Sequence, residues 1–139
     1  KTKMGRVFFD QRKNVVDITV ATAILPSDSG NLFVINQASG AYSITLPLMS
    51  AIERGWNCSF VIGTVATNAV AIINTDGEDT IVGGVAGADG GAATHAETAV
   101  DSITFISGAV LGDTCTIVSN GVNYFVTGYA ADVAHITVA

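Results

Sequence analysis

Apolar and polar residues alternate with a period of two over much of the chain, which is the pattern of half-buried β-strands. The clearest example is the stretch 112–128, where two alternating segments flank Asn120-Gly121. Asn-Gly is the strongest short-range signal for a β-hairpin, because both turn residues need a positive φ that Asn and Gly adopt at low cost. We therefore predict two antiparallel strands, 114–119 and 123–127, joined by a tight turn.

The same pattern recurs about every eight to twelve residues, with Gly, Pro, Asn, Asp and Ser between the segments. One segment, residues 48–54 between Pro47 and Gly55, has the character of a short helical turn. The chain therefore predicts an all-β fold, an antiparallel β-sandwich or barrel of about ten short strands. Besides the hairpin, the predicted strands are residues 15–25, 32–36, 42–46, 56–64, 69–74, 80–85, 102–107 and 135–138.

Low-complexity sequence marks the longest predicted loop. Residues 86–93 read AGADGGAA, which predicts a mobile surface loop. This glycine-rich segment is not flanked by a strand and a helix, so we do not interpret it as a phosphate-binding loop.

Charge divides the chain into two parts. Residues 1–13 hold five basic residues against one acidic residue, a net charge of +4, whereas from Asn14 onward one Arg stands against eleven acidic residues, a net charge of −10. Such asymmetry is typical of an interaction arm attached to a folded body. We therefore expect a basic N-terminal arm over residues 1–13 and a single β-domain over residues 14–139. The apolar triplet Val7-Phe8-Phe9 leaves open that this segment is instead a first strand of the body.

Charged residues make up only 13% of the chain, against about 25% in an average globular domain. A surface so poor in charge favours coverage by further copies of the chain or by a partner. The alternative is a neutral surface rich in Thr, Ser and Asn.

Residues that could carry chemistry are few and scattered. His95 and His135 have no evident acid–base partner in the sequence, and the acidic turn 75–79 lacks the ligand spacing of a calcium loop. Cys58 and Cys115 each lie in a predicted strand, where a cysteine is more often a buried hydrophobe than half of a disulfide. No cysteine and histidine cluster has the spacing of a zinc site. We therefore expect no catalytic residue, no metal and no cofactor.

The distribution of charge along the chain favours a protein as its partner. A basic arm could contact phosphates, but the acidic body would repel a nucleic acid, so an acidic protein surface or a neighbouring copy is the expected partner. The apolar runs are far shorter than the roughly 20 residues of a membrane span. No signal peptide is visible, and we expect neither nucleic acid nor membrane as a partner.

Two segments together carry a resemblance to a known class of proteins. The first is Ile44-Thr45-Leu46-Pro47, followed by Gly55-Trp56 and Phe60-Val61-Ile62-Gly63, and the second is the hairpin 112–128. Together they resemble small β-rich virion proteins of tailed bacteriophages, both capsid decoration (cement or head-fibre) proteins and distal modules of tail fibres. The resemblance covers about residues 42–128, its motifs are turns and strands, and it transfers no functional site.

The resemblance implies a non-enzymatic structural protein, a homotrimer on the outer capsid surface of a virion that is made in the host cytoplasm. Decoration proteins of this kind stabilise the shell by binding the major capsid protein, often through an N-terminal arm. The alternative that the resemblance leaves open is a tail-fibre or receptor-binding module that contacts the host surface. If the chain is a decoration protein, the residues expected to bind the capsid are those of the arm: Lys1, Lys3, Arg6, Val7, Phe8, Phe9, Arg12 and Lys13.

Overall fold

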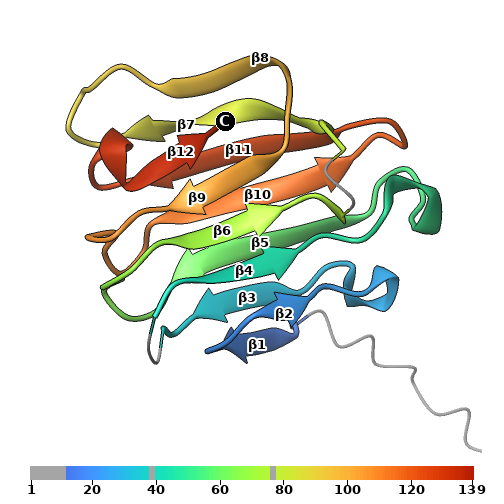
Figure 1. Ribbon diagram of the computed structural model, residues 1–139, viewed down its shortest axis with the longest axis horizontal. Coiled ribbons are helices and arrows are strands. Elements are labelled where there is room, and N and C mark those ends of the chain that lie inside the picture. Colours follow the sequence, from blue (N-terminus) through green and yellow to red (C-terminus); the bar gives the residue numbers. More distant parts are fainter. Residues whose placement is uncertain (1–11, 38–39, 76–77) are drawn as a thin grey trace, which may run out of the picture.

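The computed structural model describes residues 12–37, 40–75 and 78–139, which form two open β-sheets packed face to face (Figure 1). The larger sheet contains, in spatial order, β1 (Val15–Ile18), β3 (Leu32–Ile35), β5 (Asn57–Ile62), β10 (Thr114–Ser119), β11 (Tyr124–Ala130), β7 (Ile81–Gly87) and β8 (Thr94–Val100). The smaller sheet contains β12 (Ile136–Val138), β9 (Ser102–Phe105), β6 (Val70–Ile73), β4 (Tyr42–Thr45) and β2 (Thr22–Ala23). The all-β prediction is confirmed as a sandwich, and neither sheet closes into a barrel.

The expectation of purely antiparallel sheets is wrong. From β1 to β6 the chain alternates between the two sheets, so β1, β3 and β5 run parallel in one and β2, β4 and β6 run parallel in the other. The later strands add antiparallel pairs, such as β5 with β10 and β10 with β11. A turn rich in Gly, Pro and Ser looks the same in sequence whether the chain returns beside its own strand or crosses to the facing sheet.

Several predicted boundaries change for the same reason. The predicted strand 15–25 is two strands, β1 and β2, which belong to different sheets and are separated by a short crossing segment. The predicted loop 86–93 is shorter, because β7 continues through Gly87 and the Ala88 N–H donates to the Ala130 carbonyl at 2.8 Å. Strand β8, which the sequence pattern did not predict, follows at Thr94.

Helical structure in the described residues is limited to single 3-10 turns. The predicted helical turn 48–54 is present only as η2 (Met49–Ala51), and similar turns form at η1 (Pro26–Asp28) and η4 (Val133–His135). None of the described helical segments is long and apolar enough to cross a lipid bilayer.

The predicted hairpin is confirmed as β10 and β11, whose last pair is Ser119 with Tyr124. Its connection is a four-residue loop, because β11 begins at Tyr124 and not at 123. The Asn120 side chain accepts the N–H groups of Val122 and Asn123 at 2.8 and 2.7 Å, and Gly121 has a φ of +91°. The Asn-Gly pair therefore shapes this turn, with the Asn acting through its side chain.

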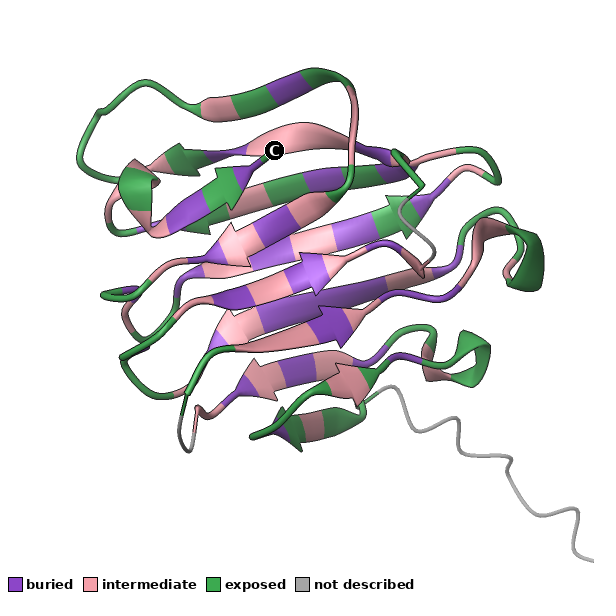
Figure 2. Ribbon diagram, viewed as in Figure 1, coloured by how far each residue is buried: buried purple, intermediate pink, exposed green. Residues whose placement is uncertain are grey.

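Buried residues alternate with more exposed ones along many of the strands, as the banding in Figure 2 shows, and the buried ones form the core between the sheets. Phe33 of β3 stacks on Phe60 of β5 with ring centroids 5.4 Å apart. β-Branched residues dominate the core because they fit a pleated surface that is buried on one side. The largest aliphatic side chains with almost no exposure are Ile35, Ile44, Leu46, Ile62, Ile72, Ile81, Ile103 and Ile117.

Candidate functional site

The predicted arm is described only at its last residues. Arg12 and Lys13 are exposed and directly precede β1, an edge strand of the larger sheet. The Asn14 carbonyl accepts the Leu32 N–H at 2.9 Å, which ties the base of the arm to β3. The remaining arm residues lie outside the described part of the chain: Lys1, Lys3, Arg6, Val7, Phe8 and Phe9.

The charge-poor composition has a clear spatial pattern. Ten of the twelve described strands carry no Asp, Glu, Lys, Arg or His. The exceptions are Asp17 on β1 and His95 and Glu97 on β8, and these are the two edge strands of the larger sheet. All other described charged residues lie in connections or at the arm, so the outer faces of both sheets are uncharged over their central strands.

The outer face of the larger sheet carries apolar side chains in two rows, and a row of hydroxyl-bearing residues, Ser59, Thr116 and Thr127, lies between them. On β10 and β11, Val118 lies opposite Phe125 and Thr114 opposite Tyr129. Val118, Phe125 and Tyr129 are 40%, 45% and 55% exposed. The row of Tyr129 and Thr114 continues with Val61 on β5 and Val34 on β3. Both valines are half-buried. We call this surface the uncharged face and define it by Val34, Val61, Thr114, Val118, Phe125 and Tyr129.

The outer face of the smaller sheet differs in chemistry. Its central positions are small and mostly hydroxyl-bearing, with Ser43, Ala71, Thr104 and Thr137 in one row. Thr and Ser keep an exposed sheet hydrated, whereas exposed aromatic and aliphatic side chains on an uncharged sheet are typical of an interaction surface. The uncharged face is therefore the better candidate for a contact with another protein.

Tertiary structure pairs His135 with a buried acid. The Asp113 side chain is 1% exposed, and its Oδ2 lies 2.7 Å from His135 Nδ1. The same oxygen accepts the Val110 N–H at 2.9 Å, and Oδ1 accepts the Ala131 N–H at 2.8 Å. No partner for His135 is evident in the sequence, because the loop before β10 and the turn η4 meet only in the folded chain.

The Asp113–His135 pair has a structural role: it links two loops through hydrogen bonds. Both Asp113 oxygens accept hydrogen bonds from backbone N–H groups, so the carboxylate holds two loops together. A nucleophilic site would place a hydroxyl or thiol within hydrogen-bond reach of the imidazole, and among the described contacts of His135 there is none. Asp113 therefore satisfies buried backbone donors, which is the role that most buried polar groups have.

The two cysteines are free and buried, as the sequence interpretation favoured. They lie on the adjacent antiparallel strands β5 and β10, with Cys58 opposite Ile117 and Cys115 opposite Phe60. Burial raises the pKa of the Cys115 thiol to about 12. Burial also raises the pKa of Cys58, with smaller contributions from Cys115 and Asp28. Both side chains therefore stay protonated at neutral pH and are part of the core.

We expect neither thiol to react with a disulfide reagent in the native protein, because the reactive thiolate is absent and access is blocked.

The free energy of unfolding should fall as the pH rises above about 8.5, because the thiols ionise there in the unfolded chain but not in the folded one. The expected fall is up to about 1.4 kcal/mol per pH unit for each cysteine. Thiol counting before and after unfolding, and urea unfolding at neutral and alkaline pH, would measure both effects. Rapid modification of a native cysteine would show that the core opens at β5 and β10.

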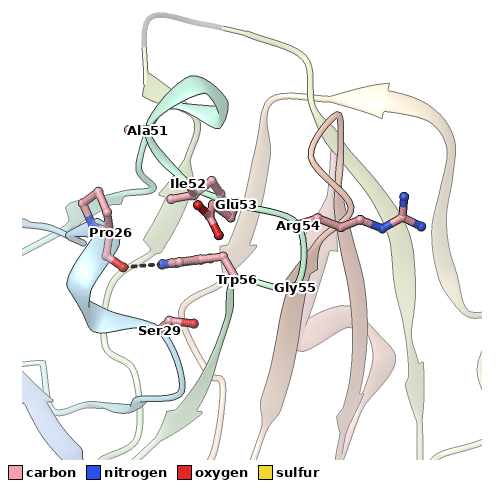
Figure 3. Close-up of a pocket in the computed structure, with 8 residues that line it drawn as sticks. All are labelled: Pro26, Ser29, Ala51, Ile52, Glu53, Arg54, Gly55 and Trp56. Carbon is pink, nitrogen blue, oxygen red and sulfur yellow. Dashed lines mark hydrogen bonds between the residues drawn. The ribbon is translucent and has the colours of Figure 1, made fainter.

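A pocket of about 420 Å³ lies between the two connections that contain η1 and η2 (Figure 3). Trp56 forms one wall, and its Nε1–H donates to the Pro26 carbonyl at 2.9 Å. The indole also packs edge to face with the Tyr124 ring, with the two ring centroids 6.0 Å apart, and Trp56 is only 5% exposed. The lining residues are Pro26, Ser29, Ala51, Ile52, Glu53, Arg54, Gly55 and Trp56.

The charged residues of this pocket point in different directions. Figure 3 shows the Glu53 side chain directed toward Pro26 and Trp56, whereas the Arg54 guanidinium extends away from them. Arg54 lies instead beside the hairpin loop. A Cβ added to Gly121 of that loop would lie 4.0 Å from the Arg54 Cβ. The pocket is therefore acidic with apolar walls. Its two halves are far apart in the sequence, and no motif signalled that they would meet.

In the described residues no group of three or more His, Cys, Asp or Glu side chains is placed to hold a metal ion. No protein-family model matches the chain, and no curated protein matches its sequence. A function is therefore inferred from the charge distribution, the uncharged face and the pocket.

Proposed function

We propose that this chain is a non-enzymatic structural protein that assembles through its uncharged face. The observation that carries this proposal is an uncharged sheet surface that exposes Val118, Phe125 and Tyr129 on an otherwise acidic body. Like-charged copies repel each other wherever their acidic loops meet. At the uncharged face there is no such repulsion, and burial of Val118, Phe125 and Tyr129 would stabilise the contact by about 25 cal/mol per Å² of apolar area.

The resemblance to phage virion proteins suggests the setting. We propose a homotrimer that decorates the outer surface of a capsid and binds the major capsid protein through residues 1–13. A protein that binds only the assembled shell stabilises it by mass action, by about 2.7 kcal/mol when the free protein is a hundredfold above its Kd. A tail-fibre or receptor-binding module is the competing assignment, and it would use the same trimer to contact the host surface.

Association through the uncharged face predicts that Phe125→Lys weakens self-association at least about tenfold, because a lysine would be buried there without a partner. The matched control is Thr137→Lys, which adds the same charge to the outer face of the smaller sheet. Light scattering should give an oligomer for the wild type and the control, and a smaller species for Phe125→Lys. Equal masses for both variants, or a monomeric wild type, would contradict the proposed interface.

The virion assignment has its own test. The full chain should co-sediment with undecorated phage capsids and raise their melting temperature, and removal of residues 1–13 should abolish binding while the oligomer persists. Full occupancy by the shortened chain would show that the arm is not the capsid contact. A chain that ignores capsids but binds host cells would support the receptor-binding assignment instead.

A further inference from the structure

Glu53 differs from the other acidic side chains of the described chain. Both oxygens of Asp113 accept hydrogen bonds. Four other aspartates each accept at least one hydrogen bond, and these are Asp17, Asp28, Asp89 and Asp132. Glu78, Asp79, Glu97 and Asp101 lie on connections or on β8 and do not line the pocket described above. Within the described residues, Glu53 combines a side chain that makes no hydrogen bond or ion pair with a place in a pocket wall.

The shape and chemistry of the pocket select the kind of group that it would bind. Pro26, Ile52 and Trp56 offer apolar walls, and the Glu53 carboxylate lies beside them. Lysine and arginine match this combination, because they pack their aliphatic stems on apolar surface and keep the charged head beside an acid. A small neutral molecule would leave the carboxylate without a counter-charge.

The base of the basic arm lies close to this pocket. Asn14 is hydrogen-bonded to Leu32, which is three residues beyond the pocket residue Ser29. Ser29 in turn accepts the N–H of Asn57 at 3.3 Å, next to Trp56. The six steps along the chain from Arg6 to Arg12 can span up to about 20 Å, so the cations of the arm can extend from its base toward the pocket of their own chain.

We propose that the pocket binds a cationic side chain of the chain's own arm, Lys1, Lys3 or Arg6, through Glu53. Tethering makes this contact intramolecular, at an effective concentration of about millimolar for a short linker, so the pocket is half occupied when the intrinsic Kd for the cationic side chain and its aliphatic stem is about 1 mM. The contact concerns the free chain and does not rest on the proposed capsid role. A partner that binds the arm would first displace it from the pocket.

A spin label on the arm tests this contact in the full chain. Thr2→Cys introduces a thiol on the arm for a nitroxide, while Cys58 and Cys115 are buried. Trp56 is the only tryptophan, so its indole N–H gives a single assignable resonance inside the pocket. We expect the nitroxide to broaden this resonance, and about 1 M salt, where the Debye length is about 3 Å, to restore it.

The matched variants separate a specific contact from general attraction to an acidic body. Glu53→Gln should restore the resonance, whereas Glu97→Gln, which removes the same charge from β8, should leave it broadened. Equal behaviour of the two variants, or no broadening in the wild type, would overturn the proposal. A mixture of spin-labelled chain with isotope-labelled, unmodified chain should show no broadening, and broadening in that mixture would place the arm on another copy and overturn the same-chain contact.

Discussion

Replacing Asp113 with alanine should lower the free energy of unfolding by about 3–5 kcal/mol, which is the range for removing one member of a buried, hydrogen-bonded charged group. The Val110 and Ala131 N–H groups would lose their acceptor, and His135 would lose its carboxylate partner. These groups lie in the loops that join β9 to β10 and β11 to β12, and each loop connects the two sheets. The substitution would therefore weaken the packing of one sheet on the other.

Urea unfolding followed by circular dichroism would measure the change. Asp132→Ala is the matched control, because that carboxylate caps the turn η4 through one hydrogen bond, from the Ala134 N–H at 2.8 Å, and its loss should cost about 1 kcal/mol. Asp113→Asn keeps an acceptor and the side-chain shape, so it should be intermediate and measurable even if the alanine variant does not fold. Equal losses for Asp113→Ala and Asp132→Ala would show that the Asp113–His135 pair is not a main source of stability.

Gly83→Ala should destabilise the protein by about 3 kcal/mol or more, because two costs add there. Gly83 has a φ of +120°, which an alanine adopts with strain. A Cβ on Gly83 would also lie 2.2 Å from the Val126 carbonyl oxygen, a backbone atom of the paired strand β11. Strands β7 and β11 would have to separate, next to the edge strand β8 of the larger sheet.

Gly112→Ala isolates the first of these costs. Gly112 has a φ of +93°, but a Cβ there would meet no heavy atom within 4 Å. We expect its loss of stability to be near 1 kcal/mol, the strain of the backbone conformation alone. Chemical denaturation of both variants would give the difference, and similar values for the two would mean that β7 moves aside without cost.

Local patterns in the sequence predicted much of the secondary structure. The alternation in 114–119 and the Asn120-Gly121 pair are properties of a few neighbouring residues, and the hairpin that they predict is present. The buried, unpaired state of Cys58 and Cys115 also follows from their place in apolar strands. Where the chain leaves one sheet for the other, as at residues 19–21, the pattern of apolar residues continues and gives no sign of the break.

The candidate sites were predictable only in part. Low charge content indicated a covered surface, but it did not say which surface. The position of Phe125 and Tyr129 on one outer face depends on the register between β10 and β11 and on which side faces the smaller sheet. The pocket and the Asp113–His135 pair join segments that are distant in the sequence, and no local pattern encodes such a meeting.

By itself, the sequence determined the all-β class, the hairpin, the separation of a basic segment from an acidic body and the low overall content of charged residues. These features follow from residue type and near-neighbour spacing, which govern backbone preference and the alternation of buried and exposed side chains. The tertiary structure alone decided that the first six strands alternate between two sheets in parallel registers, that Asp113 meets His135, and that Glu53 lies in a pocket near the base of the arm. These outcomes depend on how the two sheets pack around a common core. The free energy of that packing comes from residues far apart along the chain.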